Sequence, residues 1–269
     1  MYFSPFKGKA NNPGPEADNY CLSLNNRIIK RVSETKFLGV IIDDQLSWKP
    51  HILSLNKRLR SACGRINRIR KFLPESLHKQ IYHYLFESHL SFAISVWGGV
   101  SENQLKPLFV TQKKCIRIIF GDHDSYNDKF KTCARARPIH SQILGSEFYK
   151  KESTKPLFTK NKLLAVENLY KYRCLMEFFK IMKHRLPTSL YELFYRSNRK
   201  EAYMITPSPN HQFVYKSTNL WNDFRKITGT LDFSSSCYSI KNLLTKSLLI
   251  IQGRHGNDWC NQNFTGFKT

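Results

Sequence analysis

The sequence predicts a mainly α fold with a small N-terminal antiparallel β element (α+β), in which a helical bundle is followed by a helical C-terminal region. Apolar residues alternate with polar ones only in the first 46 residues. After Pro50 they recur every three or four residues, which is the period of an amphipathic helix. Hydrophobic residues make up 41% of the 269 residues and aromatic residues 13%, so we expect a packed globular core rather than disorder.

The N-terminal segment is expected to hold three short strands that end near Ile42. The run CLSLNNRIIKRV alternates around Asn25 and Asn26, and asparagine tolerates the positive φ angles of a tight hairpin turn. The run KFLGVII, Lys36 to Ile42, is predicted to be the third strand. Residues 1–19 are rich in Pro, Gly and Asn and are expected to be loosely ordered.

The first helix is expected to begin near Pro50, with Ser47 as its N-cap. Its apolar face is formed by Ile52, Leu55, Leu59, Ala62, Ile66 and Ile69. At 100° per residue the opposite side carries Lys57, Arg60, Arg68 and Lys71, with Arg58 and Arg65 on its flank and Gly64 in the middle. We call these seven residues the basic face. No Asp or Glu occurs between Asp44 and Glu75, so the positive charges have no acidic neighbours along the helix.

Two further helices are predicted to complete a bundle. Pro74 ends the first helix, residues 74–99 predict a more apolar second helix, and a third runs from Ser101 to Gly121. The short connections favour a compact three-helix bundle over residues 47–121. The third helix is expected to turn inward Leu105, Leu108, Phe109, Gln112, Ile116 and Ile119.

The rest of the chain is predicted to be a linker and a mostly helical C-terminal region. Residues 122–158 are polar, with a short helix expected near residues 138–145. Residues 158–187 predict one long, largely buried helix, residues 214–221 a strand or turn, and residues 238–251 a last helix. The resulting divisions are 1–46, 47–121, 122–158 and 159–269.

The net charge indicates a polyanionic partner. The chain has 43 Lys and Arg against 20 Asp and Glu, a formal charge of +23, and such a field attracts RNA and DNA. A membrane partner is not expected, because no apolar run approaches the ~20 residues of a spanning helix and the first helix needs its apolar face for the core. Gly64 in a helix costs about 1 kcal/mol, which a close phosphate approach would explain. The alternative is a solvated charged face with a tolerated glycine.

No catalytic residue, metal or cofactor is expected in this chain. The seven cysteines are scattered without a C-x-x-C pair, which is typical of reduced thiols in the nucleus or cytoplasm. The fragment HGNDWC, residues 255–260, lacks the further cysteines of a zinc site. Asp43 and Asp44 form the one candidate carboxylate pair, but two-metal catalysis needs carboxylates from separate strands. We expect a strand-end turn there, with Asp44 near a helix N-terminus.

Several runs carry a family resemblance. TKFLGVIIDDQLSWKPHI, LFESHLSFAISVWGG and LKPLFVTQKKCIRIIFG resemble the end of the palm and the thumb of reverse transcriptases from non-LTR retrotransposons, the jockey-like LINE elements. YELFYRSNRKEAYMITPSPNHQFVYKSTNLWNDF and SIKNLLTKSLL are similar to the C-terminal region of the same polyproteins. The resemblance covers nearly the whole chain.

The resemblance implies a fragment of an RNA-directed DNA polymerase. Residues 1–46 would end the palm, with Phe37, Leu38 and Gly39 in primer-grip-like strands, and residues 47–121 would form a thumb-like bundle that binds the template–primer duplex. The catalytic aspartates and Mg²⁺ would belong to a palm upstream of this chain, so the chain alone is expected to be inactive. Loss of that palm would expose a sheet edge to a partner not identified by the sequence. The alternative is a stand-alone basic nucleic-acid-binding protein without enzymatic activity.

Overall fold

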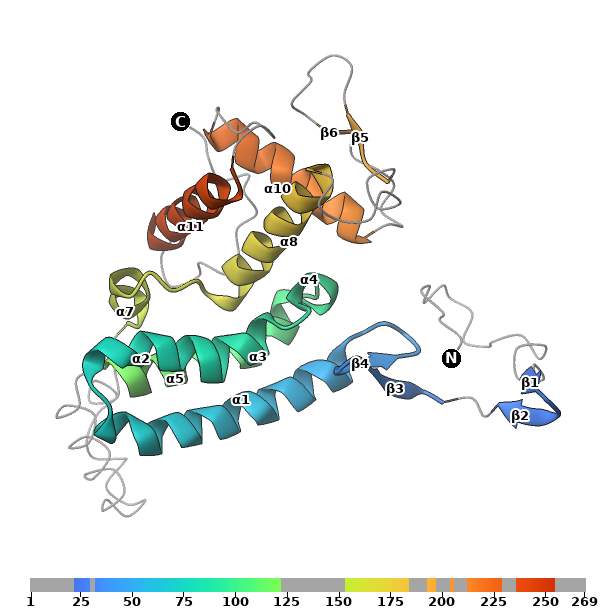
Figure 1. Cartoon of the computed structure of the whole chain (residues 1–269), viewed down its shortest axis with the longest axis horizontal. Helices are drawn as coiled ribbons and strands as arrows, with labels where there is room; N and C mark the ends of the chain where they lie inside the picture. Colours follow the sequence, from blue (N-terminus) through green and yellow to red (C-terminus); the bar gives the residue numbers. More distant parts are fainter. Residues whose placement is uncertain are drawn as a thin grey trace, which may run out of the picture. The chain divides into compact units, whose positions relative to one another are not determined.

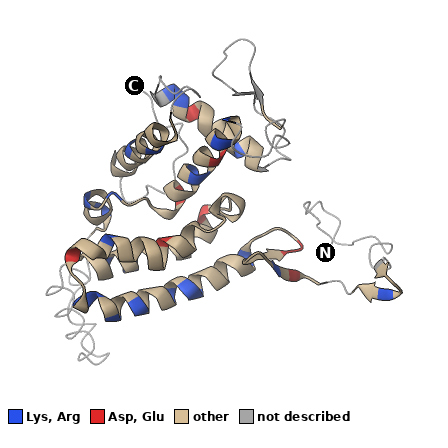
Figure 2. Cartoon of the chain, in the orientation of Figure 1, with Lys and Arg blue, Asp and Glu red and all other residues tan. Residues whose placement is uncertain are grey.

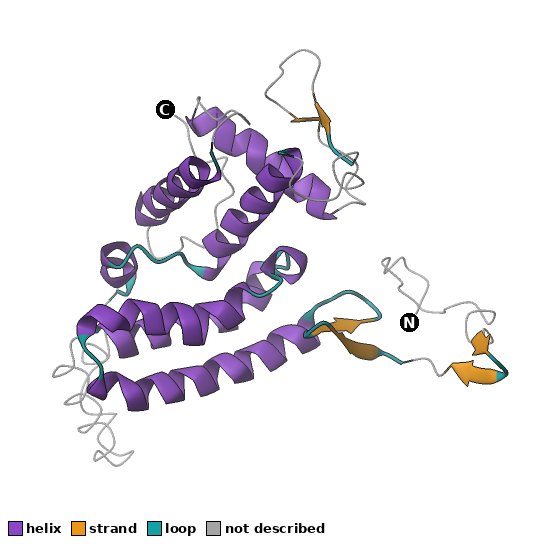
Figure 3. Ribbon diagram, viewed as in Figure 1, coloured by secondary structure: helices purple, strands orange, loops and turns teal. Residues whose placement is uncertain are grey.

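The computed structural model describes residues 22–29, 32–121, 153–183, 193–196, 204–205, 212–228 and 236–254 (Figure 1). The chain divides into two compact units, Met1–Lys57 and Arg58–Thr269, and the boundary lies inside the first helix. In the described ranges most residues are helical and the strands form three separate two-stranded sheets (Figure 3). The predicted mainly α fold with a small N-terminal β element is confirmed.

The first hairpin lies where the sequence places it. β1 (Leu22–Leu24) pairs antiparallel with β2 (Arg27–Ile29). Asn25 and Asn26 connect the strands with φ angles of 49° and 59°, the conformation that a tight two-residue turn requires.

The run KFLGVII is a second hairpin, so the prediction of one strand there is wrong. β3 (Glu34–Phe37) turns at Leu38 and Gly39 into β4 (Val40–Asp43), with Phe37 opposite Val40. The φ angles of 45° at Leu38 and 86° at Gly39 reverse the chain. Glycine adopts this conformation without the penalty of a Cβ atom, and that allows an apolar run to fold back on itself.

α1 (Lys49–Ile69) follows β4 and continues into a short 3₁₀ turn, η1 (Arg70–Phe72). The helix begins one residue before the predicted Pro50, and its first backbone hydrogen bond joins the Ile52 amide to the Trp48 carbonyl at 3.0 Å. The predicted apolar face is buried except at its last position, where Ile69 is 37% exposed. The helix therefore has one buried side and one open side along most of its length.

The segment after Pro74 is an interrupted helix rather than the single helix predicted. It comprises α2 (Glu75–Tyr82), a π-helical stretch η2 (His83–Glu87), α3 (Ser88–Ser91) and α4 (Ile94–Trp97). The break before α4 falls at Ala93, whose φ of 49° is left-handed and cannot continue an α-helix.

α5 (Glu102–Phe120) agrees with the third predicted helix. Ser101 precedes it, and its amide donates to Gln104 Oε1 at 3.3 Å, half of a capping box. All six residues predicted to face inward are buried. The Cys63 thiol of α1 donates to the Thr111 carbonyl of α5 at 3.9 Å, so these two helices are in contact.

The predicted long helix over residues 158–187 is two helices. α7 (Lys155–Lys160) ends before Lys162, which has a φ of 54°, and α8 (Val166–Met182) begins after a short non-helical segment. We call the residues between them, Leu163–Ala165, the α7–α8 connector. Its apolar side chains made it look helical in the sequence, but they are buried in an irregular backbone.

The predicted strand or turn at residues 214–221 is a helix. α10 (Gln212–Thr228) buries Val214, Trp221 and Phe224, whose spacing follows the helical period. The last predicted helix is confirmed as α11 (Cys237–Arg254). A small hairpin pairs β5 (Tyr195–Arg196) with β6 (Met204–Ile205).

A cluster of buried apolar side chains joins α8, α10 and α11. The Phe178 ring lies 5.3 Å from Trp221 and 5.0 Å from Phe194, measured between centroids. Leu244 and Ile240 of α11 complete this cluster. The loosely ordered N-terminus predicted for residues 1–19, the short helix near residues 138–145 and the fragment at residues 255–260 lie outside the described residues.

Candidate nucleic-acid interface

The basic face of α1 lies in the open. Every one of its seven residues is exposed, and the Lys and Arg positions form a row along the helix (Figure 2). Lys57 and Arg68 are eleven positions apart, which corresponds to roughly 16 Å along an α-helix, about five base-pair steps of a duplex. The row is long enough to follow several consecutive phosphates.

No described carboxylate neutralises the positive charges of this face. Within the described part of the chain, none of its six basic side chains forms an ion pair with a carboxylate. Arg65 Nη1 reaches Ser61 Oγ of the same helix at 3.5 Å, a long contact that leaves its charge available. A row of six like charges repels itself, so an external polyanion would relieve this repulsion and release its own counterions.

Gly64 has no internal reason to be glycine. A Cβ atom built at this position meets nothing within 4 Å, and the residue lies in the interior of a regular helix. Packing against a neighbouring helix or a left-handed φ would each explain a glycine, and neither applies here. Two explanations remain, a tolerated helix glycine or a close approach of a phosphate to the helix backbone.

Changing Gly64 to Ala is expected to raise the stability of the protein and to lower its affinity for nucleic acid. The free energy of unfolding should rise by about 1 kcal/mol, because alanine has the higher helix propensity and fits without contact. The affinity for an RNA–DNA hybrid should fall, because the methyl group would lie between the helix and a phosphate. Chemical denaturation and fluorescence anisotropy measure the two quantities. Unchanged affinity with the expected gain in stability would show that Gly64 is only a tolerated helix glycine.

Asp43 shapes the chain entry into α1. Its Oδ2 accepts from the Ser47 amide and its Oδ1 from the Trp48 amide, both at 2.9 Å, and the side chain is buried. His51 Nδ1 accepts from the Ile41 amide at 3.3 Å and joins the first turn of α1 to β4. Asp43, rather than the predicted Asp44, is therefore the acid that organises the start of the helix. Ser47 accepts only a long 3.4 Å contact from the Lys49 amide.

Both oxygens of Asp43 are used within its own loop, which leaves this carboxylate poorly placed for a metal. Burial raises its pKa, but the hydrogen bonds from Ser47 and Trp48 outweigh burial and hold the pKa below its ordinary value. Among the described residues, no group of three or more His, Cys, Asp or Glu could hold a metal ion.

Changing Asp43 to Ala is expected to destabilise the fold by about 2 kcal/mol at neutral pH, since two partly buried amides lose a charged acceptor. Because the folded-state pKa is lowered, this stabilisation is complete above the ordinary value of 3.8 and disappears as the pH falls through the folded pKa below it. Denaturation across a pH series measures the difference. The adjacent Asp44→Ala variant is the control, with a change under about 0.5 kcal/mol. An equal loss from both variants would contradict the loop role of Asp43.

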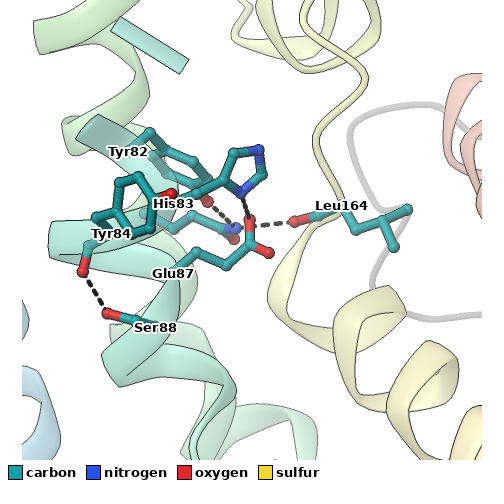
Figure 4. Close-up of polar contacts among 7 residues, drawn as sticks. Tyr82, His83, Tyr84, Glu87, Ser88 and Leu164 are labelled. Atoms are coloured by element: carbon teal, nitrogen blue, oxygen red, sulfur yellow. Dashed lines mark hydrogen bonds and ion pairs between the residues drawn. The ribbon is translucent and has the colours of Figure 1, made fainter. Parts of the chain in front are cut away.

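Gln112 and Gln252 hold the α7–α8 connector, a role that the sequence does not indicate. Gln112 Nε2 donates to the Leu164 carbonyl and to the Tyr82 hydroxyl, each at 2.9 Å, and Figure 4 labels these two partners. Gln112 Oε1 also accepts from the Val166 amide at 3.0 Å. Gln252 Oε1 accepts from the Ala165 amide at 2.9 Å and its Nε2 donates to the Leu163 carbonyl at 3.1 Å. In the sequence, the only indication of this role is that Gln112, a polar residue, occupies a predicted inward position of the third helix.

The predicted primer-grip-like residues form the tip of the β3–β4 hairpin. Phe37 is 61% and Leu38 78% exposed, and Gly39 is half-buried in the turn. In the first hairpin Leu24, Ile28 and Ile29 are exposed as well. These apolar side chains belong to two-stranded sheets whose outer edges are unpaired among the described residues.

Three known proteins are similar to this chain over part of its length. The RNA-directed DNA polymerase from the mobile element jockey of Drosophila funebris is 30% identical over 103 residues, which is 37% of this chain and 11% of that protein. The jockey polymerase of Drosophila melanogaster is 26% identical over 103 residues, again 37% of this chain and 11% of that protein. The probable RNA-directed DNA polymerase from transposon X-element of the same species is 23% identical over 119 residues, which is 39% of this chain and 13% of that protein.

The resemblance to jockey-like non-LTR reverse transcriptases is confirmed over 37–39% of this chain. The chain spans about a tenth of the length of the curated relatives that it matches. No family model and no solved structure matches it.

The described part of the chain has two further properties. None of its helices combines the length and the apolar composition that crossing a bilayer requires. Cys63, Cys115, Cys174 and Cys237 are free thiols. Burial raises the pKa of the Cys174 thiol to about 12, so this cysteine stays protonated at neutral pH.

Proposed function

We propose that this chain binds nucleic acid through the basic face of α1 and thereby contributes the template–primer grip of a jockey-like reverse transcriptase. The proposal rests on a row of exposed cations that form no ion pair among the described residues, on a helix whose opposite side is buried in the protein core. Phosphate contacts of this kind position a duplex without reading its sequence. Binding should therefore be insensitive to sequence and strongly dependent on salt.

The confirmed resemblance supports the same assignment from a separate direction. The relatives are named as RNA-directed DNA polymerases, which act on RNA and DNA. In the resemblance, the basic face falls on the first helix of the thumb. The exposed tip of the β3–β4 hairpin, Phe37 to Gly39, would correspondingly contact the primer strand.

We further propose that this chain does not itself perform DNA synthesis. The carboxylate of Asp43 is occupied by the amides of Ser47 and Trp48, so the most conspicuous acidic pair in the sequence serves a loop. The purified chain should therefore show no Mg²⁺-dependent primer extension on an RNA template. Extension that is abolished in both Asp43→Ala and Asp44→Ala variants would overturn this part of the proposal. The free thiols and the nucleic-acid partner favour an intracellular location, in the nucleus or cytoplasm.

The test of the proposed function is hybrid binding across a salt series. The wild-type chain is compared with a variant in which Lys57, Arg60, Arg68 and Lys71 are changed to Gln. A shallower salt dependence in the variant would support the proposal, and an unchanged one would show that the basic face is solvated surface. A stand-alone binding protein without a catalytic partner would use the same surface and give the same result.

A further inference from the structure

Phe72 stands out among the apolar side chains at the end of the basic face. It is 86% exposed, the largest exposed fraction among the large hydrophobic side chains in the described ranges. An isolated exposed hydrophobic residue is common on protein surfaces and needs no explanation by itself. The position of Phe72 is unusual for another reason, because it directly follows Lys71, the last cation of the basic face.

The backbone that carries Phe72 is held on both sides. Phe72 ends the 3₁₀ turn η1, in which the Leu73 amide donates to the Arg70 carbonyl at 3.3 Å. Arg70, two residues before it, is 92% buried in contrast to its exposed neighbours, with a relative exposure of 8%. After the turn, Pro74 accepts from the Leu77 amide at 3.0 Å and begins α2. The phenyl ring is thus presented from a defined corner of the fold rather than from a free loop.

The charge around this corner is mainly positive. Lys71 is adjacent in sequence, and Arg68 lies four residues earlier on the exposed side of α1. Glu75 in the first turn of α2 is the nearest acid in the sequence and is also exposed. An exposed ring beside a row of cations matches the two parts of an unpaired nucleotide, because the ring stacks on the base and the cations contact the phosphates.

We infer that Phe72 is a base-stacking platform that makes the basic face prefer nucleic acid with unpaired bases next to a duplex. An uninterrupted duplex presents only phosphates and groove edges to the row of cations. At a duplex end or a single-stranded overhang the face of a base becomes available, and stacking on an aromatic side chain is tolerant of sequence. This inference rests on the proposed nucleic-acid binding of α1 and names the nucleic-acid structure that the site selects.

The test uses the full chain and three fluorescent RNA–DNA hybrids that share one duplex. The first carries a short single-stranded overhang, the second an overhang of the same length made of abasic sites, and the third is closed by a hairpin loop at that end. Replacing Phe72 by Ala should weaken binding of the first probe on the order of tenfold and leave the other two within about twofold. The abasic probe keeps the phosphates and therefore isolates the base.

Matched variants separate stacking from other causes. Phe72→Trp should retain the affinity, whereas Phe72→Leu, which stays apolar but has no ring, should lose it. Tyr238→Ala on α11 removes an aromatic side chain that is 74% exposed and serves as the control, with no effect expected. A 2-aminopurine at the first unpaired position should be quenched by the wild-type chain and not by Phe72→Ala.

Each outcome decides between the alternatives. An equal loss of affinity for all three probes would assign Phe72 a structural role, and full binding by Phe72→Leu would indicate apolar contact without stacking. No change for any probe would mean that the exposed ring has no role in nucleic-acid binding, and each of these results overturns the inference. The variant with Lys57, Arg60, Arg68 and Lys71 changed to Gln tests the proposed function separately. If its hybrid binding depends less on salt while Phe72→Ala binds normally, only the stacking inference fails. If the wild-type chain binds none of the probes, the proposed function fails with it.

Discussion

Changing Lys57, Arg60, Arg68 and Lys71 together to glutamine is expected to lower the salt dependence of hybrid binding by about three to four units in the slope of log affinity against log salt. Each phosphate neutralised by a cation contributes a slope of about −0.9 for a duplex, because its condensed counterion is released on binding. Between 200 mM and 50 mM salt, the wild-type chain should therefore gain roughly a hundredfold more affinity than the variant.

The fold should survive this substitution. The four side chains are exposed, and glutamine has a helix propensity close to that of lysine and arginine. Removal of like charges from one face would even favour the helix slightly. Circular dichroism and a denaturation curve confirm that the variant is folded before binding is compared.

A matched control keeps the net charge change the same. Lys160, Lys180, Lys241 and Lys246 are also exposed but lie on α7, α8 and α11. Their joint change to Gln alters the total charge equally and should leave most of the slope in place. Equal slopes for the two variants would show that the overall charge of +23 attracts the polyanion without a defined surface, and would contradict the assignment to α1.

Changing Gln112 to Leu is expected to destabilise the chain by about 3 kcal/mol or more. The Val166 amide and the Leu164 carbonyl would be left without their partner in a buried site, and each such group costs about 1–3 kcal/mol. Leucine fills a similar volume, so the loss would arise from unsatisfied hydrogen bonds rather than from a cavity. Urea denaturation measures the free energy of unfolding, and the exposed Gln80→Leu provides the control.

Hydrogen exchange locates the effect. The Val166 amide should exchange much faster in Gln112→Leu, and the Ala165 amide in Gln252→Leu, because these are the amides that the two glutamines accept from. Both side chains hold one short connector, so the double variant should lose less stability than the sum of the single variants. A Gln112→Leu variant within about 0.5 kcal/mol of wild type would show that the connector is held by its apolar side chains alone.

Patterns of local sequence determined much of the secondary structure. The buried side of α1, the inward side of α5 and the last helix follow from hydrophobic residues three and four positions apart, because burying one face of a helix requires that spacing. The basic side of α1 follows from the same geometry. The turn at Asn25 and Asn26 was predictable because these residues tolerate the left-handed conformation.

Other features depended on contacts between residues distant in the chain. Nothing near Leu163 forbids a helix, but Gln112 and Gln252 satisfy the backbone of the connector and of the adjoining Val166 in a non-helical form, from 52 or more positions away. Gly39 is the one residue within KFLGVII that indicates a turn, because the apolar residues around it are equally typical of one continuous strand. The strand or turn predicted at residues 214–221 is instead part of α10, whose buried residues Val214, Trp221 and Phe224 follow the helical period.

The sequence alone determined that the chain is basic, that α1 separates its cations from its apolar residues, and that it resembles jockey-like polymerases. Periodicity, charge and similarity are local or additive properties, so they can be read along the chain. The tertiary structure decided that Asp43 serves a loop, that Gly64 faces open space and that Phe72 is exposed beside the cations. The exposure of a side chain and its hydrogen-bond partners depend on which distant segments pack together, and this packing cannot be derived from the sequence pattern alone.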